Sequence, residues 1–362
     1  MVAKKKEQEV AIAPKMFETG VVSLDLQMGG GLPKSKLIEL NGESCCGKTT
    51  LMLHVAKSII KQGGKVAYFD IEDGIDMSML SSMGTLDSCL GKSFFLEKVN
   101  LFSDLQKRID YYFGKDLKDR TKPAKRHEDT PDLIVIDSLA MLVPDASKEK
   151  DIETNVSNNM IAARYQTQLV KDIISDLGSV GTSVVFINHT VLKMKKIGFN
   201  MMQATQDSAG GQMIKYGPDI RFYLGDTKEI KKERRTIQGM QEARIGATAN
   251  IWTKKSRLAD NGIKLPIKII DARGVFNGHT LLPICENQGW ITTLGGGWYT
   301  ITKPLVKEDV KVQTTDKAEV WCQQNADLII GTLKKLGLYK LTYDRPENIT
   351  MSDIVLSPNV KK

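Results

Sequence analysis

The sequence predicts a doubly wound α/β domain with a mostly parallel sheet, followed by a small C-terminal α/β module. Four short, nearly continuous apolar segments are typical of strands buried on both faces of such a sheet: residues 36–42, 65–73, 132–142 and 183–189. Helical segments alternate with them at 49–63 and 158–178, which favours a parallel sheet covered by helices. After residue 275 the segments become shorter, with LGGGWYTI at 294–301 and a helix expected near 316–336.

The composition narrows the class of protein. The chain has 362 residues, 41% of them hydrophobic, so it can bury a large core and form two domains. Its five cysteines are too scattered for a disulfide scaffold or a zinc ribbon: Cys45, Cys46, Cys89, Cys285 and Cys322. No apolar run approaches 18 residues, and the first residues lack a signal-peptide pattern. We expect a cytoplasmic protein with no membrane span, and the net charge of +8 favours polyanionic partners.

We expect four parts along the chain: a short arm at 1–16, a core at 17–275, a small domain at 276–345 and a tail at 346–362. Residues 112–132 are charged, contain two prolines and are expected to form an exposed insertion in the core. Residues 226–247 are expected to form a hairpin connection or a lid.

A phosphate-binding pattern lies between the first long strand and its helix. Gly42, Gly47, Lys48 and Thr49 satisfy G-x4-G-K-[ST]. Glycines let successive backbone N–H groups turn toward an anion, and the helix N-terminus adds its positive end. Lys48 would reach the β- and γ-phosphates and the Thr49 hydroxyl would bind Mg²⁺. Such a short pattern can match by chance, but the flanking strand and helix favour a nucleotide site.

Acidic residues follow two other predicted strands. Asp137 could hold the Mg²⁺ shell, although Asp-Ser after a strand is also an ordinary turn. Glu72 could polarise water as a general base. Asp70, Asp73 and Asp76 compete for that role, and spacing alone does not decide between them.

The polar triplet Asn188-His189-Thr190 ends the strand at 183–189, at the sheet edge where ligands of open α/β sheets bind. His189 could contact the γ-phosphate and pass nucleotide state to the long basic loop expected at 192–208. The alternative is a hydrogen-bonded cap on a core strand, followed by a solvated loop.

The order of these motifs resembles the RecA family. FETGVVSLDLQMGGGLPKSKLIELNGESCCGKTTL is similar to the opening of the bacterial RecA ATPase core. AYFDIEDGID, LIVIDSLAMLVP, NNMIAAR, FINHT, SAGGQMIKYGPDIRFYL and KKSR follow in the family's order, so the resemblance covers about residues 17–275. Within the family, the chain resembles the UvsX-type recombinases of large bacteriophages in its INHT and KSR motifs and in its size.

The resemblance implies a RecA-type P-loop ATPase core and a role for each matching residue. ATP would be bound by Gly42, Glu43, Ser44, Cys45, Cys46, Gly47, Lys48, Thr49, Thr50 and Asp76, with Mg²⁺ at Thr49 and Asp137. Glu72 would activate water and His189 would sense the γ-phosphate. Residues 146–159 and the stretch after His189 would be DNA-binding loops, with contacts from Arg164, Lys193, Lys195, Lys196, Gly210, Gly211 and Gln212. Lys215 and Tyr216 would relay nucleotide state across a subunit interface, and Lys255 and Arg257 would reach the neighbouring subunit's ATP.

The implied function is a DNA-dependent ATPase that forms a head-to-tail helical filament on single-stranded DNA and pairs it with homologous double-stranded DNA. Single-strand-binding and mediator proteins are candidate partners, and the nucleoid or an infected cell's replication compartment is the expected location. The rival functions are a ring-forming DNA motor, such as a helicase or branch-migration ATPase, and a DNA-coating paralogue that exchanges no strands. A kinase-like enzyme without DNA is disfavoured by KKSR and by the loop that Gly210 and Gly211 close.

Overall fold

The structure is a computed structural model of the chain. It describes residues 16–84, 86–116, 122–145, 155–197, 201–208, 212–237, 239–256 and 262–339. Residues 1–15 of the predicted arm and the whole predicted tail lie outside these ranges. Among the described residues, no helix combines the length and apolarity that a membrane crossing requires.

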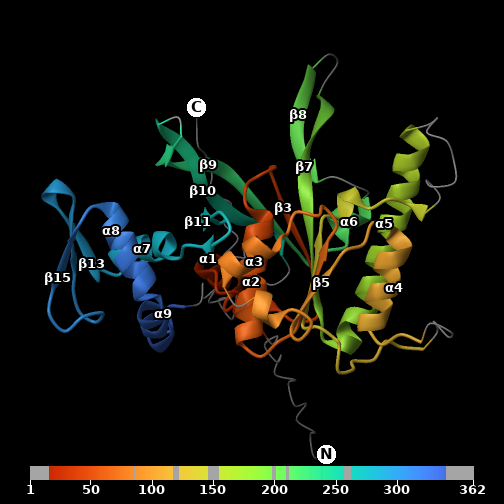
Figure 1. The fold of residues 1–362 in the computed structure, drawn as a ribbon, viewed down its shortest axis with the longest axis horizontal. Coiled ribbons are helices and arrows are strands. Elements are labelled where there is room, and N and C mark those ends of the chain that lie inside the picture. Colours follow the sequence, from red (N-terminus) through yellow and green to blue (C-terminus); the bar gives the residue numbers. More distant parts are fainter. Residues whose placement is uncertain are drawn as a thin grey trace, which may run out of the picture.

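A ten-stranded sheet organises the described part of the core, in the order β12-β11-β10-β9-β3-β7-β6-β4-β5, with β8 paired to β7 (Figure 1). Six strands run parallel: β3 (Leu37–Gly42), β4 (Val66–Asp70), β5 (Phe94–Glu97), β6 (Leu133–Asp137), β7 (Ser183–Ile197) and β9 (Ile220–Thr236). The antiparallel strands are β8 (Met201–Ser208), β10 (Gly239–Ser256), β11 (Lys264–Ile270) and β12 (Gly274–Val275). The prediction of a mostly parallel sheet is confirmed.

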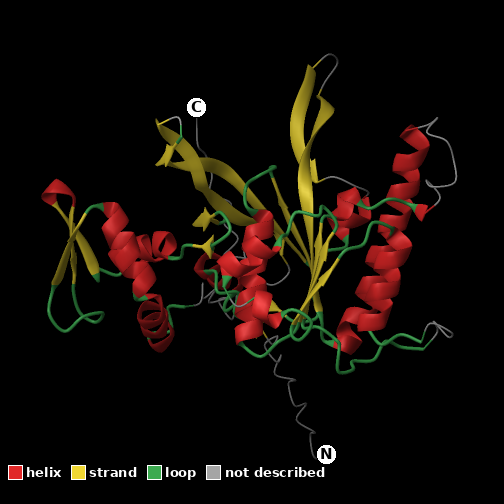
Figure 2. Ribbon diagram, in the orientation of Figure 1, coloured by secondary structure: helices red, strands yellow, loops and turns green. Residues whose placement is uncertain are grey.

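Helices cover both faces of this sheet (Figure 2). One face carries α1 (Val22–Met28), α2 (Lys48–Lys61) and α3 (Met77–Met83), and the other carries α4 (Phe102–Tyr112), α5 (Asn155–Val180) and α6 (Gln212–Tyr216). Successive residues of one strand enter opposite cores: Val66 and Tyr68 belong to the first, Ala67 and Phe69 to the second. This double burial explains why the strands have nearly continuous apolar sequences. Short 3-10 turns occur at Asp87–Cys89 and Leu139–Met141.

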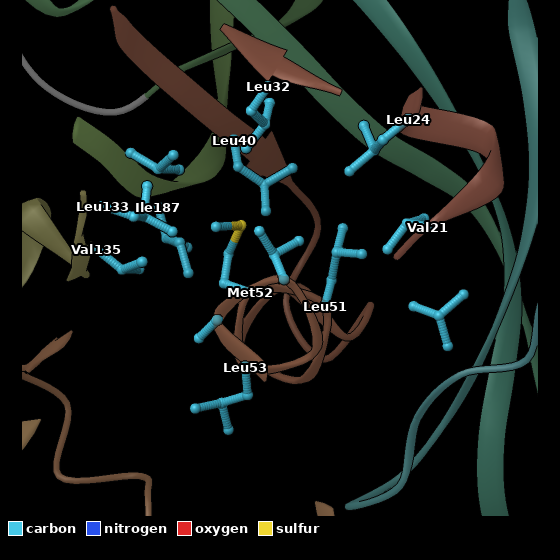
Figure 3. Packing of buried hydrophobic residues seen from close by; sticks show 14 of the residues in the cluster. Val21, Leu24, Leu32, Leu40, Leu51, Met52, Leu53, Leu133, Val135 and Ile187 are labelled. Carbon is cyan, nitrogen blue, oxygen red and sulfur yellow. The ribbon is translucent and has the colours of Figure 1, made fainter. Parts of the chain in front are cut away.

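The segment 42–49, which carries the G-x4-G-K-[ST] pattern, is called the phosphate loop below, and the helix α2 at its end is anchored in the first core. Leu51, Met52 and Leu53 are all buried in this core, and Figure 3 shows Met52 on the side of α2 that faces β3 and β6. Because these side chains hold α2 against the sheet, the beginning of the helix stays at the carboxyl edge of β3.

The described part of the C-terminal module, up to residue 339, has its own small sheet and three helices. The sheet is β13 (Ile291–Leu294), β14 (Trp298–Ile301) and β15 (Val310–Gln313), and the helices are α7 (Gly278–Asn287), α8 (Thr315–Gln324) and α9 (Ala326–Lys335). A 3-10 turn at Gly295–Gly297 joins β13 to β14. Val22 and Leu26 of α1 complete this module's apolar core. A two-stranded sheet of β1 (Met16–Phe17) and β2 (Leu32–Pro33) flanks α1.

Several local predictions were wrong. The single helix expected near 316–336 is two helices, because the chain leaves helical geometry at Asn325, where ψ is 20° and φ is −108°. The insertion at 112–132 is not simply exposed: Phe113 and Ala124 are buried in the core, and Arg126 donates to Val180 O at 3.0 Å.

The loop expected at 192–208 is a hairpin in which β7 continues to Ile197 and pairs with β8. The hairpin expected at 226–247 is confirmed by β9 and β10.

Candidate functional site

The phosphate loop joins β3 to α2, and its glycines are required by close approach and backbone geometry. A Cβ on Gly42 would lie 2.4 Å from the carbonyl oxygen of Leu224, so a larger residue would displace β9. Gly47, the N-cap of α2, has φ 96°, in the left-handed region that favours glycine. These two positions let the loop turn sharply and open α2 at its end, as an anion-binding loop requires.

The ammonium of Lys48 lies within this loop. Its Nζ donates to Glu43 O at 2.6 Å and to Gly42 O at 3.2 Å, and the side chain is buried. Both acceptors are neutral carbonyls, and a charged phosphate oxygen makes a stronger hydrogen bond. Cys45 is exposed beside it, whereas burial raises the pKa of the Cys46 thiol.

Asp137 at the end of β6 faces the first turn of α2. Its Oδ2 accepts hydrogen bonds from Thr49 Oγ1 at 2.6 Å and from the Tyr68 hydroxyl at 2.8 Å. Burial raises the pKa of Asp137, these two bonds oppose the rise, and the charges of Glu72 and Asp70 add to it. The structure thus brings together the two residues predicted for Mg²⁺. Their oxygens suit a hard cation, which would in turn favour the ionised carboxylate.

Glu72 stands two residues beyond β4 and meets two side chains from neighbouring strands. Its Oε1 accepts from Ser138 Oγ at 2.5 Å and lies 2.9 Å from His189 Nε2. Burial acts to raise the pKa of Glu72, but the hydrogen bonds with Ser138 and His189 outweigh it, and the net pKa is lowered. Glu72 is 36% exposed, so the ionised carboxylate can be reached by water.

The competing acids have other partners. Asp70 is buried and accepts from the backbone N–H groups of Gly74 at 3.0 Å and Ile75 at 2.9 Å, so it shapes the turn after β4. Asp73 is exposed and pairs with Lys98. Asp76 caps α3 by accepting from Met79 N at 2.7 Å, and this bond lowers the pKa of Asp76. Among these four described acids, Glu72 is the one in contact with His189.

The polar triplet Asn188-His189-Thr190 on β7 divides between the two expected roles, because two of its residues are hydrogen-bonded within the sheet and one faces Glu72. Asn188 is buried and donates to Glu39 Oε1 at 3.0 Å, and Thr190 donates to Asn41 Oδ1 at 3.0 Å. These two residues are hydrogen-bonded within the sheet, as an ordinary strand would require. His189 lies opposite Gly42 in the register of β3 and β7, and its side chain instead reaches Glu72.

The hairpin of β7 and β8 rises from this site. Its pairing runs from Thr190–Ser208 to Ile197–Met201, so Lys193, Lys195 and Lys196 lie on its outgoing strand. Figure 1 shows it projecting on the same side of the molecule as the beginning of α5. Arg164 is exposed on α5 and Gln212 is exposed at the start of α6.

Other predicted DNA-binding positions are only partly described. Gly210, Gly211 and 146–154 lie outside the described residues, and 155–159 belong to α5 rather than to a loop.

The predicted interface residues lie together. Lys255 on β10 donates from Nζ to Tyr216 O at 2.8 Å and to Pro218 O at 2.7 Å. Tyr216 ends α6, with Lys215 before it, and its side chain is 70% exposed. Arg257 lies outside the described residues. Lys255 is therefore connected to the segment that follows the hairpin of β7 and β8.

The sequence pattern of the RecA N-terminal domain matches residues 1–89 and 126–275. The chain belongs to the RecA family. The gap in the match contains the segment 112–125, which begins the insertion described above. The family assignment confirms the predicted RecA-type core.

Curated relatives agree with this assignment over most of the chain. A Protein RecA of Parasynechococcus marenigrum (strain WH8102) is 27% identical over 326 residues, covering 90% of this chain and 77% of that protein. A Protein RecA of Nostoc sp. (strain PCC 7120) is 28% identical over 321 residues, covering 84% and 81%. A Protein RecA of Thermosynechococcus vestitus is 29% identical over 285 residues, covering 78% and 71%.

Three site residues of this RecA-family chain were not predicted. Tyr68 and Ser138 hold Asp137 and Glu72, and Arg244 donates to Cys45 O in the phosphate loop at 2.7 Å. Ser138 stood beside a predicted carboxylate, but nothing in the spacing indicated its bond to Glu72. Tyr68 looked like a core residue of β4, and Arg244 came from a hairpin with many charged residues.

Proposed function

We propose that this chain is an ATP-dependent recombinase that coats single-stranded DNA as a head-to-tail helical filament and exchanges strands with homologous duplex. The observation that carries the proposal is the meeting of two pairs at the edge of the sheet. Thr49 and Asp137 form one pair, and Glu72 and His189 form the other. The phosphate loop lies beside Asp137, which is hydrogen-bonded to Thr49 and could hold Mg²⁺, and beside Glu72, whose pKa is lowered. This combination suits phosphoryl transfer to water.

The residues present fit ATP and Mg²⁺. Residues 42–50 would hold the phosphates, with Lys48 inside the loop, and Thr49 and Asp137 would hold the metal shell. When bound, ATP supplies the phosphoryl group that water attacks, and Mg²⁺ neutralises its charge. Asp76, at the start of α3, is proposed near the adenine.

Glu72 and His189 would couple hydrolysis to DNA binding. Glu72 is kept ionised by its hydrogen bonds, so it can accept a proton from water. His189 connects this carboxylate to β7, and the same strand continues into the basic hairpin. A change at Glu72 would therefore reach Lys193, Lys195 and Lys196 along one strand, and these lysines would bind DNA phosphates with little sequence preference.

Assembly would complete the site. Lys255 and Arg257 are proposed to act on the ATP of the neighbouring subunit, with Lys215 and Tyr216 as the relay. A cation supplied in trans makes hydrolysis depend on a head-to-tail contact, and such contacts produce open helical filaments when they do not close. Single-strand-binding and mediator proteins are further proposed partners, and the UvsX type is the proposed branch of the family.

The first test is ATP hydrolysis with and without single-stranded DNA over a range of salt concentrations. We expect strong stimulation by DNA that disappears as salt rises, because counterions compete with phosphate contacts. Hydrolysis indifferent to DNA would leave an ATPase and remove the recombinase. A strand-exchange assay and negative-stain images then separate it from a DNA-coating paralogue and from a ring-forming motor.

A further inference from the structure

The outer side of the phosphate loop is held by an arginine from a distant hairpin. Arg244 lies on β10, and its Nη2 donates to Cys45 O at 2.7 Å. The rest of the guanidinium forms ion pairs with two carboxylates: Nη1 lies 3.6 Å from Glu229 Oε1, and Nε lies 3.3 Å from Asp271 Oδ2 without a hydrogen bond. Three elements, namely β9, β10 and the turn after β11, thus fix one side chain against the loop.

A β-bulge in β10 sets the direction of the Arg244 side chain. The pairing of β9 with β10 shifts register between Arg244 and Gly246, so Ile245 is the extra residue. A β-bulge bends its strand and re-aims the neighbouring side chains. Gly246 allows the tight approach of β11, because a Cβ there would lie 2.3 Å from Ile269 O. Asp271 is tied to the bulge by its backbone N–H, which donates to Ile245 O at 3.0 Å.

The bond to Cys45 O has a consequence for the next amide. A peptide unit is planar and trans, so its C=O and the following N–H point in opposite directions. While Arg244 holds the carbonyl of Cys45, the N–H of Cys46 must point away from Arg244. Cys45 has φ 56°, a left-handed conformation that a non-glycine residue rarely adopts without support.

We propose that Arg244 is a positioning residue: by gripping Cys45 O it presets the Cys46 N–H to bind a nucleotide phosphate. The inference rests on the nucleotide site proposed above. It also makes the hairpin of β9 and β10 part of the phosphate-binding apparatus, although its outer half extends beyond the site and its side chains are mostly exposed. Arg244 touches no reacting atom and acts through the backbone of the loop.

The test is equilibrium binding of a fluorescent ATP analogue without DNA, for the wild type, Arg244→Ala and Arg244→Lys. Loss of one hydrogen bond from a charged donor should weaken binding by about tenfold. Arg244→Lys keeps the charge but lacks the fork that reaches Cys45, Glu229 and Asp271 together, so it should restore binding only in part. Full restoration by lysine would show a simple charge effect and overturn the positioning role.

Lys231→Ala is the matched control. Lys231 lies opposite Arg244 on the same hairpin, but it pairs with Glu242 and does not touch the phosphate loop. It should leave nucleotide affinity unchanged. Equal loss in Lys231→Ala and Arg244→Ala would mean that any charge on the hairpin matters, and the inference would fall.

Hydrogen exchange of the peptide covering residues 42–47, without nucleotide, tests the mechanism directly. Exchange should be faster in Arg244→Ala and unchanged in Lys231→Ala. If Arg244→Ala does not fold, Glu229→Gln, which loosens the guanidinium but keeps it, should still accelerate exchange. If the wild type binds no ATP, the proposed nucleotide site is wrong. If the wild type binds ATP and folded Arg244→Ala binds it with the same affinity, only this inference is wrong.

Discussion

The two carboxylates of the site have opposite electrostatic environments. Burial dominates at Asp137 and raises its pKa, whereas hydrogen bonds with Ser138 and His189 dominate at Glu72 and lower its pKa. Such a separation is typical of sites where two acids have different tasks. In the proposed site, a cation near Asp137 would favour its ionised form, whereas hydrogen bonds already favour the ionised form of Glu72.

Ser138→Ala tests this assignment at Glu72. Removing the hydroxyl deletes a hydrogen bond that favours the ionised carboxylate, so the pKa of Glu72 should rise. A general base must be ionised, and the acidic limb of the pH profile for kcat should therefore move to higher pH. We expect the fractional decrease in kcat to be largest at the acidic end of the profile and smallest at neutral pH, measured by ATP hydrolysis with saturating DNA.

The matched control is Ser175→Ala on α5, whose hydroxyl donates to Asp172 O within its own helix. Its pH profile should coincide with that of the wild type. A profile of Ser138→Ala that is lowered equally at every pH would remove Glu72 from the role of base.

At the scale of elements, the central strands and α2 could be predicted because each is determined by its own residues. Strands buried on both faces must be apolar throughout, and a G-x4-G-K-[ST] loop requires a strand before it and a helix after it. The extension of β7 could not be predicted in this way. Residues 190–197 mix four apolar residues with a threonine and three lysines, unlike the nearly continuous apolar central strands, and they form a strand because β8 supplies the paired backbone groups. The break at Asn325 is likewise not marked by a Gly or Pro, and buried residues of both α8 and α9 belong to the core of the C-terminal module.

The hairpin of β7 and β8 makes a quantitative prediction for DNA binding. Each lost phosphate contact reduces the slope of log K against log salt for a single strand by about 0.7, so replacing Lys193, Lys195 and Lys196 by alanine should reduce it by about 2. Fluorescence anisotropy with a labelled oligonucleotide over a salt series measures this slope. Lys307, Lys311 and Lys317, exposed on the C-terminal module, form a triple control with the same change in charge. An equal decrease in both triple variants would point to net charge instead of contacts from the hairpin.

The helix α1 contains a buried acid that should make stability depend on pH. Desolvation raises the pKa of Asp25 to about 6, against the opposing hydrogen bonds from Thr19 and Tyr339. The folded pKa lies above the unfolded value of 3.8, so the native state prefers the protonated acid. The stabilising contribution is complete below about pH 4 and is lost as pH rises through about 6, a change of about 3 kcal/mol.

Asp25→Asn should remove this dependence. The amide oxygen can still accept from Thr19 but does not titrate, so the wild type should lose stability relative to the variant as pH rises from 4 to 7.5. Denaturant unfolding at both pH values gives the free energies of unfolding. A difference between wild type and variant that stays constant with pH would contradict the assignment.

At the scale of the whole molecule, the predictable part of the site consists of polar residues at or just after the ends of parallel strands. The meeting of Thr49 with Asp137 and of Glu72 with His189 follows from the parallel sheet, since the carboxyl ends of its strands share one edge. Tyr68, Ser138 and Arg244 could not be predicted, because no sequence motif marks the bond that each of them makes to its distant partner. Their residue types are common in cores, turns and charged hairpins.

Lys255 has a structural role within its own chain and a proposed role at the ATP of the neighbouring subunit. Within its own chain it holds the carbonyl groups of Tyr216 and Pro218, so its loss could act by loosening α6 or by removing a cation from a neighbouring site. Activity of Lys255→Ala alone cannot separate these two effects. A mixture of two inactive variants can.

Lys48→Ala lacks a working nucleotide site but keeps Lys255, whereas Lys255→Ala keeps its nucleotide site but offers no cation. In a head-to-tail assembly mixed equally and at random, about a quarter of the interfaces join an intact site to an intact Lys255. DNA-stimulated ATP hydrolysis should therefore recover to about a quarter of the wild-type rate on mixing, while each variant alone stays inactive. Recovery would also establish that Lys255→Ala is folded and its site intact. If Lys255 serves its own subunit, or if α6 fails to form without it, every interface in the mixture is defective and the rate stays at the level of the single variants.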